Sequence, residues 1–374
     1  MSSPHADSAS RRSAAAKRVT LADVARRAGV SKTAASFVLN GRREEMRISN
    51  EIELRVLEAA RETGYRPNIV SRSLRTGTTH TIGFVSDIVA TTPFAGNFIK
   101  GALEAARDRG YLLLIAETEG DTTLEQQLLE AMIDRQVDGI VFAAMYTRKL
   151  TVPRLLRSRR SVMLNAVPNR PGSLPSVIPD ELEAGRTAAR TLLDAGHRNG
   201  IYLIGVGTRK PPATRSLAAL ERLQGINASL RAAGVRAEGA IACDDWQPEL
   251  GHAAVRTILD RGAPPKALIC FNDRLALGAY NALAEAGLEV PTDTSVVSFD
   301  DDPIASWVQP QLTTIALPHY ELGQRSIGVL LDDHGRNDRA PAITRVPMPL
   351  RLRESIGPPR EAAPGTSRQK RPRS

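Results

Sequence analysis

The chain has 374 residues, of which 42% are hydrophobic and 24% charged, and its net charge is +9. This length is roughly two to three times that of a typical domain, so more than one domain is expected. No apolar run approaches the ~20 residues of a membrane-spanning helix, and residues 1–17 lack the apolar segment of a secretion signal. The two cysteines, Cys243 and Cys270, argue against a disulfide scaffold or a thiolate zinc site. These features indicate a cytoplasmic protein with a sizeable core.

Positive charge is concentrated near the two ends of the chain. Residues 1–80 carry 15 Lys or Arg and 8 Asp or Glu, residues 81–356 carry 30 and 32, and residues 357–374 carry 5 and 1. A basic segment joined to a near-neutral middle predicts a small polyanion-binding module on a globular body. Low complexity in 1–18 and prolines in 357–374 predict two disordered basic tails.

Residues 19–66 show the spacing of three short helices. Their expected caps are Thr20, Ser31 and Ser49, and their expected ends are Gly29, Leu39 and Gly64. We expect the third helix to bury a stripe made of Ile52, Val56, Leu57 and Ala60. A small residue, Ala25, with Gly29 four positions later is typical of the turn in a helix-turn-helix unit.

The second of these helices has two chemically different sides. Ala35, Val38 and Leu39 are expected to face inward, whereas Lys32, Thr33, Ser36 and Phe37 fall on the other side. A helix that presents its N-terminal residues in this way can read the major groove of DNA. Lysine can donate to guanine, threonine can bond a base edge, and an aromatic ring can contact the thymine methyl group. The alternative is a plain three-helix bundle in which Phe37 fills a gap in the core.

The segment Val19–Leu74, which runs through "VTLADVARRAGVSKTAASFVLNGRR" to "GYRPN", resembles the DNA-binding head of the LacI/GalR family of bacterial transcription regulators. The resemblance implies that residues 67–80 form a hinge helix and linker, folded on operator DNA and paired across the dyad of a homodimer. It also implies that Leu74 wedges into the minor groove, which bends the DNA. Alternatively, Leu74 is an ordinary linker residue. The implied DNA-binding residues are Thr20, Lys32, Thr33, Ser36, Phe37, Asn40, Asn68, Val70 and Leu74.

From residue 81 onward, short apolar runs alternate with helical segments. The expected strands are 81–85, 112–116, 139–143, 162–165, 201–205, 267–271 and 296–299. The expected helices are 98–109, 124–135, 181–195, 217–233, 249–260, 274–286 and 320–332. This alternation predicts parallel sheets with helices on both faces. The length favours two α/β lobes with doubly wound sheets behind the small all-α helix-turn-helix domain.

The same family resemblance extends over residues 81–356, through "ERLQGINASLRAAG", "ICFNDRLALGAYNALAEAG" and "SVVSFDDDPIASWVQPQLTTI". It implies a ligand-sensing core like that of periplasmic sugar-binding proteins (type I), with an N-lobe at about 81–177 and 305–332. The C-lobe is then expected at about 178–304 and 333–356. Ligands of open α/β sheets bind at the carboxyl ends of the strands, so the cleft between the lobes is the expected site.

The resemblance also implies which residues bind the ligand. They are Asp87, Phe94, Asp180, Arg222, Asp245, Trp246 and Asp273. An arginine fork, carboxylates and an aromatic face suit a carbohydrate. The alternatives are that Arg222 lies on the surface of a helix, that Trp246 belongs to the core, and that Asp273 caps the helix that follows it.

The function expected from these features is that of a homodimeric repressor of transcription. It would bind a pseudo-palindromic operator, and a sugar or sugar derivative would control its affinity. One alternative is a regulator whose cleft has lost ligand binding, and another is a free sugar-binding protein. An enzyme is not favoured, because P-loop, Gly-x-Ser-x-Gly and metal-ligand spacings are missing, and no cofactor or metal is expected. The tail 357–374 has no leucine seam, so we expect the assembly to stop at a dimer.

Overall fold

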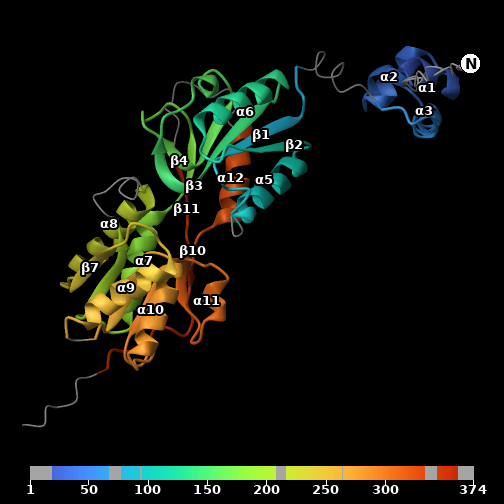
Figure 1. Ribbon diagram of the computed structural model, residues 1–374. Coiled ribbons are helices and arrows are strands. Elements are labelled where there is room, and N and C mark those ends of the chain that lie inside the picture. Colours follow the sequence, from blue (N-terminus) through green and yellow to red (C-terminus); the bar gives the residue numbers. More distant parts are fainter. Residues whose placement is uncertain are drawn as a thin grey trace, which may run out of the picture. The chain divides into compact units, whose positions relative to one another are not determined.

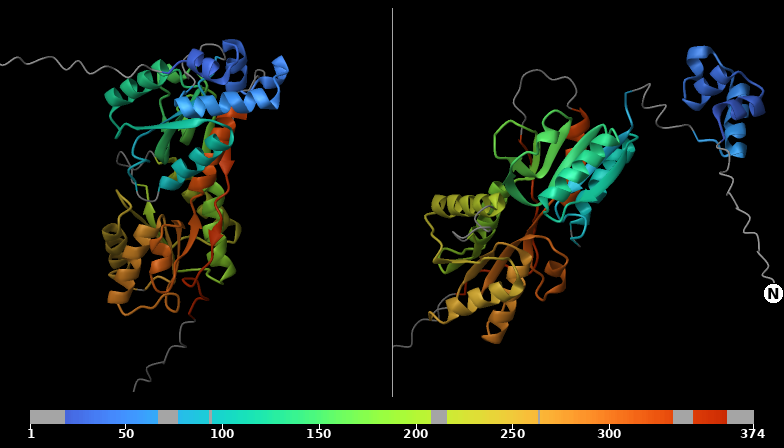
Figure 2. Two further views of the ribbon diagram at one scale, coloured as in Figure 1. Left: turned by 90° about the vertical axis from the view of Figure 1, so that its right-hand side faces the viewer. Right: turned by 45° about the horizontal axis from the view of Figure 1, so that its top comes forward.

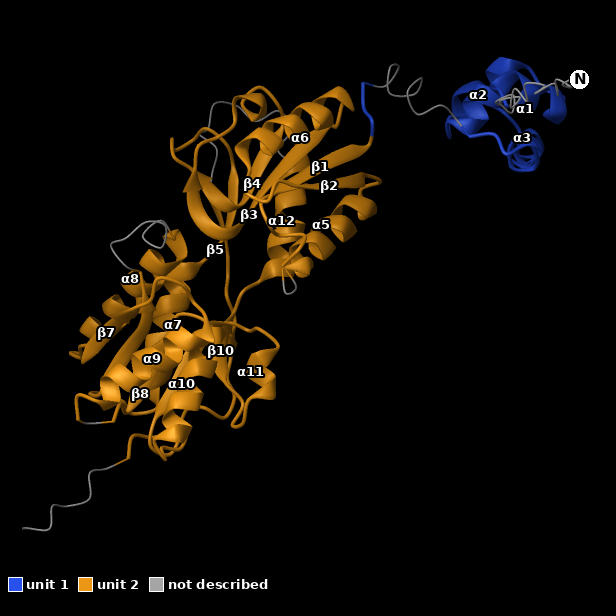
Figure 3. Cartoon of the chain, in the orientation of Figure 1, with its two compact units in different colours: residues 1–79 blue, residues 80–374 orange. Residues whose placement is uncertain are grey.

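The computed structural model describes residues 19–66, 77–92, 95–207, 216–262, 264–332 and 343–360. The chain divides into two compact units, residues 1–79 and 80–374 (Figures 1 and 3). None of the described helices is long and apolar enough to cross a membrane. The expected tail 1–18 and most of the expected hinge helix, residues 67–76, lie outside the described residues, as do residues 361–374.

The first unit contains the three helices that the sequence predicts. They are α1 (Leu21–Ala28), α2 (Lys32–Leu39) and α3 (Asn50–Thr63), with a 3-10 turn at Arg43–Met46. The Oγ of Ser31 caps α2 by accepting the N–H of Ala34 at 3.1 Å. Gly29 ends α1 at φ +64°, a left-handed conformation that glycine adopts without steric cost and that turns the chain into α2. The predicted helix-turn-helix geometry is therefore confirmed.

The core of this unit is built from small and β-branched side chains. Val24, Ala25 and Ala28 of α1 pack with Ala35 and Val38 of α2 and with Val56, Ala59 and Ala60 of α3. The expected burial of Leu57 is wrong, because this side chain is 47% exposed. Val56, Ala59 and Ala60 follow one another at i, i+3 and i+4, whereas Leu57 is rotated about 100° away from that stripe.

The second unit consists of two lobes, each built on a six-stranded sheet, as the predicted fold class requires. In order across the sheet, the first contains β11 (Ile343–Val346), β5 (Ser176–Pro179), β4 (Ser161–Pro168), β3 (Gly139–Leu150), β1 (Thr81–Ser86) and β2 (Leu112–Glu117). The second contains β12 (Leu350–Arg351), β10 (Thr313–Ala316), β9 (Ser295–Asp300), β8 (Ala267–Cys270), β6 (Ile201–Val206) and β7 (Gly239–Ala242). The strand pairs are parallel except for β10 with β12.

Helices cover both faces of the sheets. The first lobe has α5 (Gly96–Asp108), α6 (Thr122–Asp134), α12 (His319–Asp332) and a 3-10 turn at Arg154–Leu156. The second has α7 (Glu181–Asp194), α8 (Leu217–Ala232), α9 (Pro248–Leu259), α10 (Asp273–Glu285) and α11 (Ile304–Trp307). Along β1, Ile82 and Phe84 join the core beneath α5 and α12, whereas Val85 joins the core beneath α6. Burial on both faces explains why the strands are apolar throughout rather than alternating.

The lobe boundaries differ from the expected ones. Strand β10 and all but the first residue of α11 lie within the range 305–332 expected in the N-lobe, yet α11 packs on α10 and β10 pairs with β9 of the second sheet. Strand β11 lies within the range expected in the C-lobe, yet it pairs with β5 of the first sheet. The described chain therefore passes between the lobes at 179–181, 316–319 and 346–350, as the colours in Figure 2 allow the reader to follow.

The unpredicted strands β5, β7, β10, β11 and β12 have at most four residues each, too few for a period to show. The expectation that disorder begins at residue 357 is also wrong. Gly357 donates its N–H to the Oγ of Ser295 at 3.0 Å, and Arg360 forms an ion pair with Asp293. Local composition predicted a tail at a point where the chain still packs on the second lobe.

Helices α7 and α8 cross at a contact that only glycine permits. A methyl group on Gly185 would lie 2.2 Å from the carbonyl oxygen of Arg222, and one on Gly225 would lie 2.1 Å from that of Leu182. Both distances are far inside van der Waals contact, so the two backbones touch. This contact fixes the first turn of α7, which begins at Glu181, against the turn of α8 that carries Arg222.

Candidate functional site

The outer side of α2 forms the first candidate site. Lys32 and Thr33 are exposed at its N-terminal end, and Ser36 and Phe37 are half-buried one turn later. Phe37 is not part of the hydrophobic cluster that joins the three helices. The guanidinium carbon of Arg42, which is not among the predicted DNA-binding residues, lies 5.2 Å from the centre of the Phe37 ring. The aromatic ring is thus held on the outer side by a cation rather than packed into the core.

Two of the other predicted DNA-binding residues already have partners within this unit. The Oγ1 of Thr20 donates to a carboxylate oxygen of Asp23 at 2.7 Å, within the capping box of α1. The Nδ2 of Asn40 donates to the carbonyl oxygen of Ser36 at 2.6 Å, at the end of α2. These bonds fix the two ends of the helix-turn-helix. Asn68, Val70 and Leu74 lie outside the described residues.

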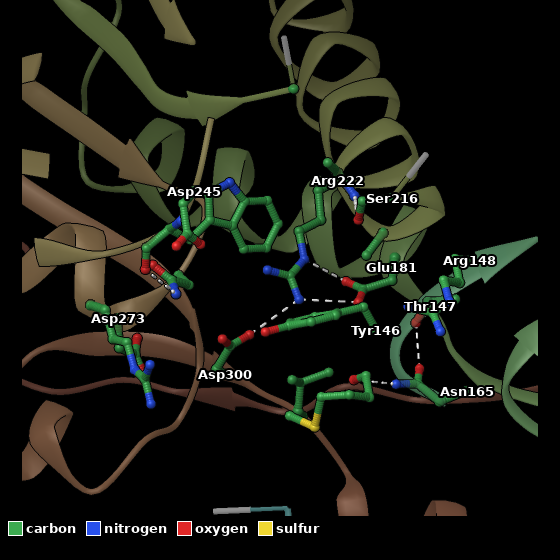
Figure 4. A pocket seen from close by; sticks show the side chains of 18 of the residues that line it. Tyr146, Thr147, Arg148, Asn165, Glu181, Ser216, Arg222, Asp245, Asp273 and Asp300 are labelled. Carbon is green, nitrogen blue, oxygen red and sulfur yellow. Dashed lines mark hydrogen bonds and ion pairs between the residues drawn. The ribbon is translucent and has the colours of Figure 1, made fainter. Parts of the chain in front are cut away.

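The second candidate site is a cavity of about 560 Å³ between the two lobes (Figure 4). Its walls come from the carboxyl end of β3, from the first turns of α7, α8 and α10, and from the segments after β7 and β9. The charged lining residues are Arg148, Lys149, Glu181, Arg222, Asp244, Asp245, Asp273, Arg274, Asp300 and Asp302. Tyr146 and Trp246 contribute aromatic rings to the same walls. The cavity is at the strand ends, where ligands of open α/β sheets bind.

Arg222 lies at the base of this cavity, and its side chain is only 2% exposed. Its Nε and Nη2 donate to the two carboxylate oxygens of Glu181 at 2.6 and 3.0 Å, and Nη2 also reaches Asp300 at 3.2 Å. Its Nη1 donates to the carbonyl oxygen of Phe271. A guanidinium has five N–H donors, so these bonds leave at most one for a ligand. The alternative of a surface arginine is wrong.

Aromatic rings complete the surroundings of the guanidinium. Its central carbon lies 4.5 Å from the ring centre of Phe299 and 5.5 Å from that of Trp246. The Trp246 indole N–H donates to the carbonyl oxygen of Gly205 at 3.0 Å. Trp246 is half-buried and lines the cavity, so its ring belongs to the wall. The adjacent Asp245 accepts the backbone N–H of Trp246 at 2.7 Å.

Two carboxyl groups near this base have raised pKa values. Burial, reinforced by the charge of Asp300, raises the pKa of Asp273 to about 8. Burial also raises the pKa of Asp300 itself to about 6, although the Arg222 charge acts in the opposite direction. Asp273 is bonded to the hydroxyl groups of Ser298 and Thr314 and to the N–H of Asp302. The alternative that it caps α10 is wrong, since Asn272 accepts the N–H of Leu275 as the cap.

The first lobe contributes the end of β3. Between Ala143 and Arg148 the register of β3 against β4 shifts, and Asn165 donates to the carbonyl oxygens of Ala144 and Met145 at 3.0 and 2.8 Å. Arg148 forms an isolated antiparallel bridge with Ser216, which caps α8 of the second lobe. This segment therefore joins the two lobes at the cavity, and Figure 4 shows Tyr146 extending from it toward Asp300.

The predicted ligand residues fall into three groups. Arg222, Asp245, Trp246 and Asp273 line the cavity together. Asp87 and Asp180 do not line it. Asp87 accepts from Arg148 at 2.8 Å and from the N–H of Met145 at 2.9 Å, and Asp180 caps α7. Phe94 lies outside the described residues.

Four lining residues are not among those predicted from the sequence: Tyr146, Asn165, Glu181 and Asp300. The sequence did offer an indication for Glu181, because this residue directly follows Asp180, a predicted ligand residue, at the start of a predicted helix. Asp300 begins a run of three aspartates directly after the predicted strand 296–299. Asp302 accepts the N–H of Ile304, whereas Asp300 faces Arg222.

Family models match almost the whole described chain. One, described as bacterial regulatory proteins, lacI family, matches residues 20–68. The other, described as periplasmic binding proteins and sugar binding domain of LacI family, matches residues 79–352. The ribose operon repressor of Escherichia coli strain K12 is 33% identical over 315 residues, which are 83% of this chain and 92% of that protein.

Solved structures resemble the chain over a similar length. The lac repressor dimer bound to operator and the anti-inducer ONPF has a TM-score of 0.72 and 25% identity, and the match covers 91% of this chain and 100% of that one. The transcriptional regulator CelR in complex with cellobiose has a TM-score of 0.60 and 26% identity, and covers 90% and 100%. The helix-turn-helix unit and the two-lobed body of this chain are therefore found together in each of these proteins.

Proposed function

Because the chain belongs to the LacI family of bacterial regulatory proteins, we propose that it represses transcription as a homodimer on a pseudo-palindromic operator. A sugar or sugar derivative in the cavity controls its affinity for that operator. One observation carries the proposal: the chain joins a helix-turn-helix with an exposed Lys32 and Thr33 to a body with a polar cavity at its strand ends. The chain is a regulator and not an enzyme, since its relatives are regulators of transcription.

The DNA-reading part of the proposal assigns base contacts to Lys32, Thr33 and Phe37, and further DNA contacts to Thr20, Ser36 and Asn40. One head reads only a few base pairs, so two heads across a dyad supply the specificity. Asn68, Val70 and Leu74 act in the paired hinge segments, where Leu74 enters the minor groove. Such a protein acts in the cytoplasm, at the nucleoid.

The sensing part of the proposal rests on the cavity and on the sugars in the names of relatives, of which one represses a ribose operon and another is in complex with cellobiose. Arg222, Asp245, Trp246 and Asp273 contact the ligand, and Asp87 acts by holding Arg148. A ligand that binds one arrangement of the lobes more tightly shifts the population toward that arrangement. The shift changes how the two hinge segments pair, and operator affinity follows.

Selection of bound sequences from random DNA, followed by footprinting, tests the DNA-reading part. The expected product is an inverted repeat protected on both half-sites, and its affinity falls steeply with salt. Leu74→Ala is expected to remove DNA bending and to leave sugar binding unchanged. A footprint on a single asymmetric half-site contradicts the proposal.

Light scattering tests the assembly. A mass of two chains is expected, because the segment after Ile356 offers no leucine, isoleucine or valine for a coiled-coil seam. A mass near four chains that falls to two on removal of residues 361–374 would show that the tail does assemble.

A further inference from the structure

The guanidinium at the base of the cavity is already bound to a carboxylate. An arginine fork is the group with which proteins hold a phosphate or a carboxylate through two parallel hydrogen bonds. In Arg222 the two edges of that fork, Nε and Nη2, are taken by the two oxygens of Glu181 at 2.6 and 3.0 Å. Glu181 thus occupies the place that an anionic group of a ligand would need (Figure 4).

The base of the cavity also has more negative than positive charge. Arg222 faces two carboxylates, those of Glu181 and Asp300, at 2.6 to 3.2 Å. The neighbouring Asp273 adds no charge near neutral pH, because its pKa is raised to about 8. The three groups that remain carry one positive and two negative charges, and two of them are 2% exposed.

The other described cations of the lining do not change this balance at the base. Arg148 is paired with Asp87 at 2.8 Å, and Arg274 lies 4.0 Å from Asp302. Lys149 is exposed, so water screens its charge. The carboxylates of Asp244 and Asp245 also line the cavity and add negative charge.

We propose that the cavity selects a polyhydroxylated ligand with no negative charge on the group that reaches Arg222, and that Glu181 sets this selection. The inference rests on the proposed sensing function of the cavity. A hydroxyl or ammonium group can donate to the free lone pairs of Glu181 and Asp300. A phosphate or carboxylate group meets two carboxylates in a region of low dielectric, where like charges repel strongly. The selection therefore follows from the pairing of Arg222 with Glu181 inside the protein.

Inorganic phosphate is the probe, and the emission of Trp246 is the readout. The chain has two tryptophans, and the other, Trp307, is 74% exposed on α11 and does not line the cavity. In full-length protein that carries Trp307→Phe, emission reports the cavity alone, even when phosphate also binds the basic head. Phosphate is titrated at constant ionic strength into this parent, into its Glu181→Gln variant and into a matched control, Glu183→Gln.

The Glu181→Gln variant is expected to bind phosphate at least about tenfold more tightly than the parent, because charge-assisted hydrogen bonds of Arg222 become available. The Glu183→Gln control should behave like the parent, since Glu183 pairs with Arg186 at 3.1 Å on the exposed side of the same helix. Equal phosphate affinity in all three proteins, or saturable binding to the parent as tight as to Glu181→Gln, overturns the proposal.

A second variant guards against misfolding of the first. Asp300→Asn removes the other carboxylate of the base and is expected to strengthen phosphate binding in the same direction. If neither Glu181→Gln nor Asp300→Asn binds phosphate more tightly than the parent, Glu181 does not set the selection. No operator DNA enters this measurement. A failure of sugar to alter operator binding would refute the proposed function instead, and would leave the charge selection standing.

Discussion

The outer side of α2 and the base of the inter-lobe cavity differ in the burial of their candidate binding residues. Lys32 and Thr33 are exposed, so their hydrogen-bonding groups are available to an external partner such as DNA. Arg222 and Asp273 are buried and already bonded to neighbours within the chain. Surface contacts can be exchanged for DNA contacts one at a time. A buried network, in contrast, couples ligand recognition to the stability of the body.

The strongest test of this contrast removes the buried cation. Arg222→Met leaves Glu181 and Asp300 without their partner, so we expect the free energy of unfolding of the body to fall by about 3–5 kcal/mol. Urea denaturation in the Trp307→Phe background, followed by Trp246 emission, measures this. Arg190→Met, at an exposed pair on α7, is the control and should change stability by less than about 1 kcal/mol. A small loss in Arg222→Met would mean that the network is weakly coupled.

The next test moves the network without altering a charge. Gly225→Ala places a methyl group against the carbonyl oxygen of Leu182, so α8 must shift away from α7. We expect a loss of about 1–3 kcal/mol in unfolding free energy, together with weaker sugar binding, because Arg222 moves relative to Glu181.

The matched control for this change is Gly328→Ala in α12. The nearest atom to its added methyl group is a side-chain oxygen of Asp332 at 3.6 Å. This helix interior should tolerate alanine or gain up to about 1 kcal/mol. Equal effects of Gly225→Ala and Gly328→Ala would show that the contact between α7 and α8 does not position the site.

In the helix-turn-helix unit, a single substitution should alter DNA recognition and leave stability unchanged. Lys32→Ala is expected to lower discrimination at one or two base pairs by about 1–3 kcal/mol. The unfolding free energy should stay within about 0.5 kcal/mol, because the side chain is exposed. Competition binding between the selected operator and single-base variants measures the first quantity. If affinity drops equally on every sequence, Lys32 contacts only phosphate.

A separate test concerns the pH dependence of stability. Because the pKa of Asp273 rises from 3.8 to about 8 on folding, the folded chain holds a proton that the unfolded chain has released between those values. Stability should therefore fall as pH rises through this window, by up to about 1.4 kcal/mol per pH unit. Asp273→Asn cannot titrate and should show a flatter profile between pH 5 and 7.5. Parallel profiles for the two proteins would refute the assignment.

The two regions also differ in how far the sequence could predict them. Helix caps and apolar spacing are local, so α1, α2 and α3 were predicted nearly to the residue, and β1, β2, β6 and β9 to within one residue at each end. Strands β3 and β4 extend beyond their predicted ends at residues 143 and 165, to Leu150 and Pro168. The error at Leu57 arose because apolar spacing defines the buried face of a helix only to within about one residue. The close packing of the three helices buries the smaller Ala59 in the core instead.

The cavity depended on contacts between distant residues. A carboxylate that directly follows Asp180 could be recognised as part of the site only by seeing that Glu181 faces Arg222, 41 positions later. Sequence spacing does not contain the close approach of α7 to α8 that brings these groups together. The same limit explains why Asp87, predicted to touch the ligand, instead holds Arg148.

The hydrogen bonds of Arg222 have a consequence for the life of the protein in a cell. Since Glu181, Asp300 and Phe271 bind the guanidinium from within the chain, the buried charge of Arg222 does not depend on a ligand for its partners. Binding then adds stability by mass action but is not needed to fold the body. A sensor must persist when its signal is missing, and proteases remove proteins mainly through their unfolded fraction. The internal partners of Arg222 thus let the abundance of the protein stay independent of the supply of the molecule it detects.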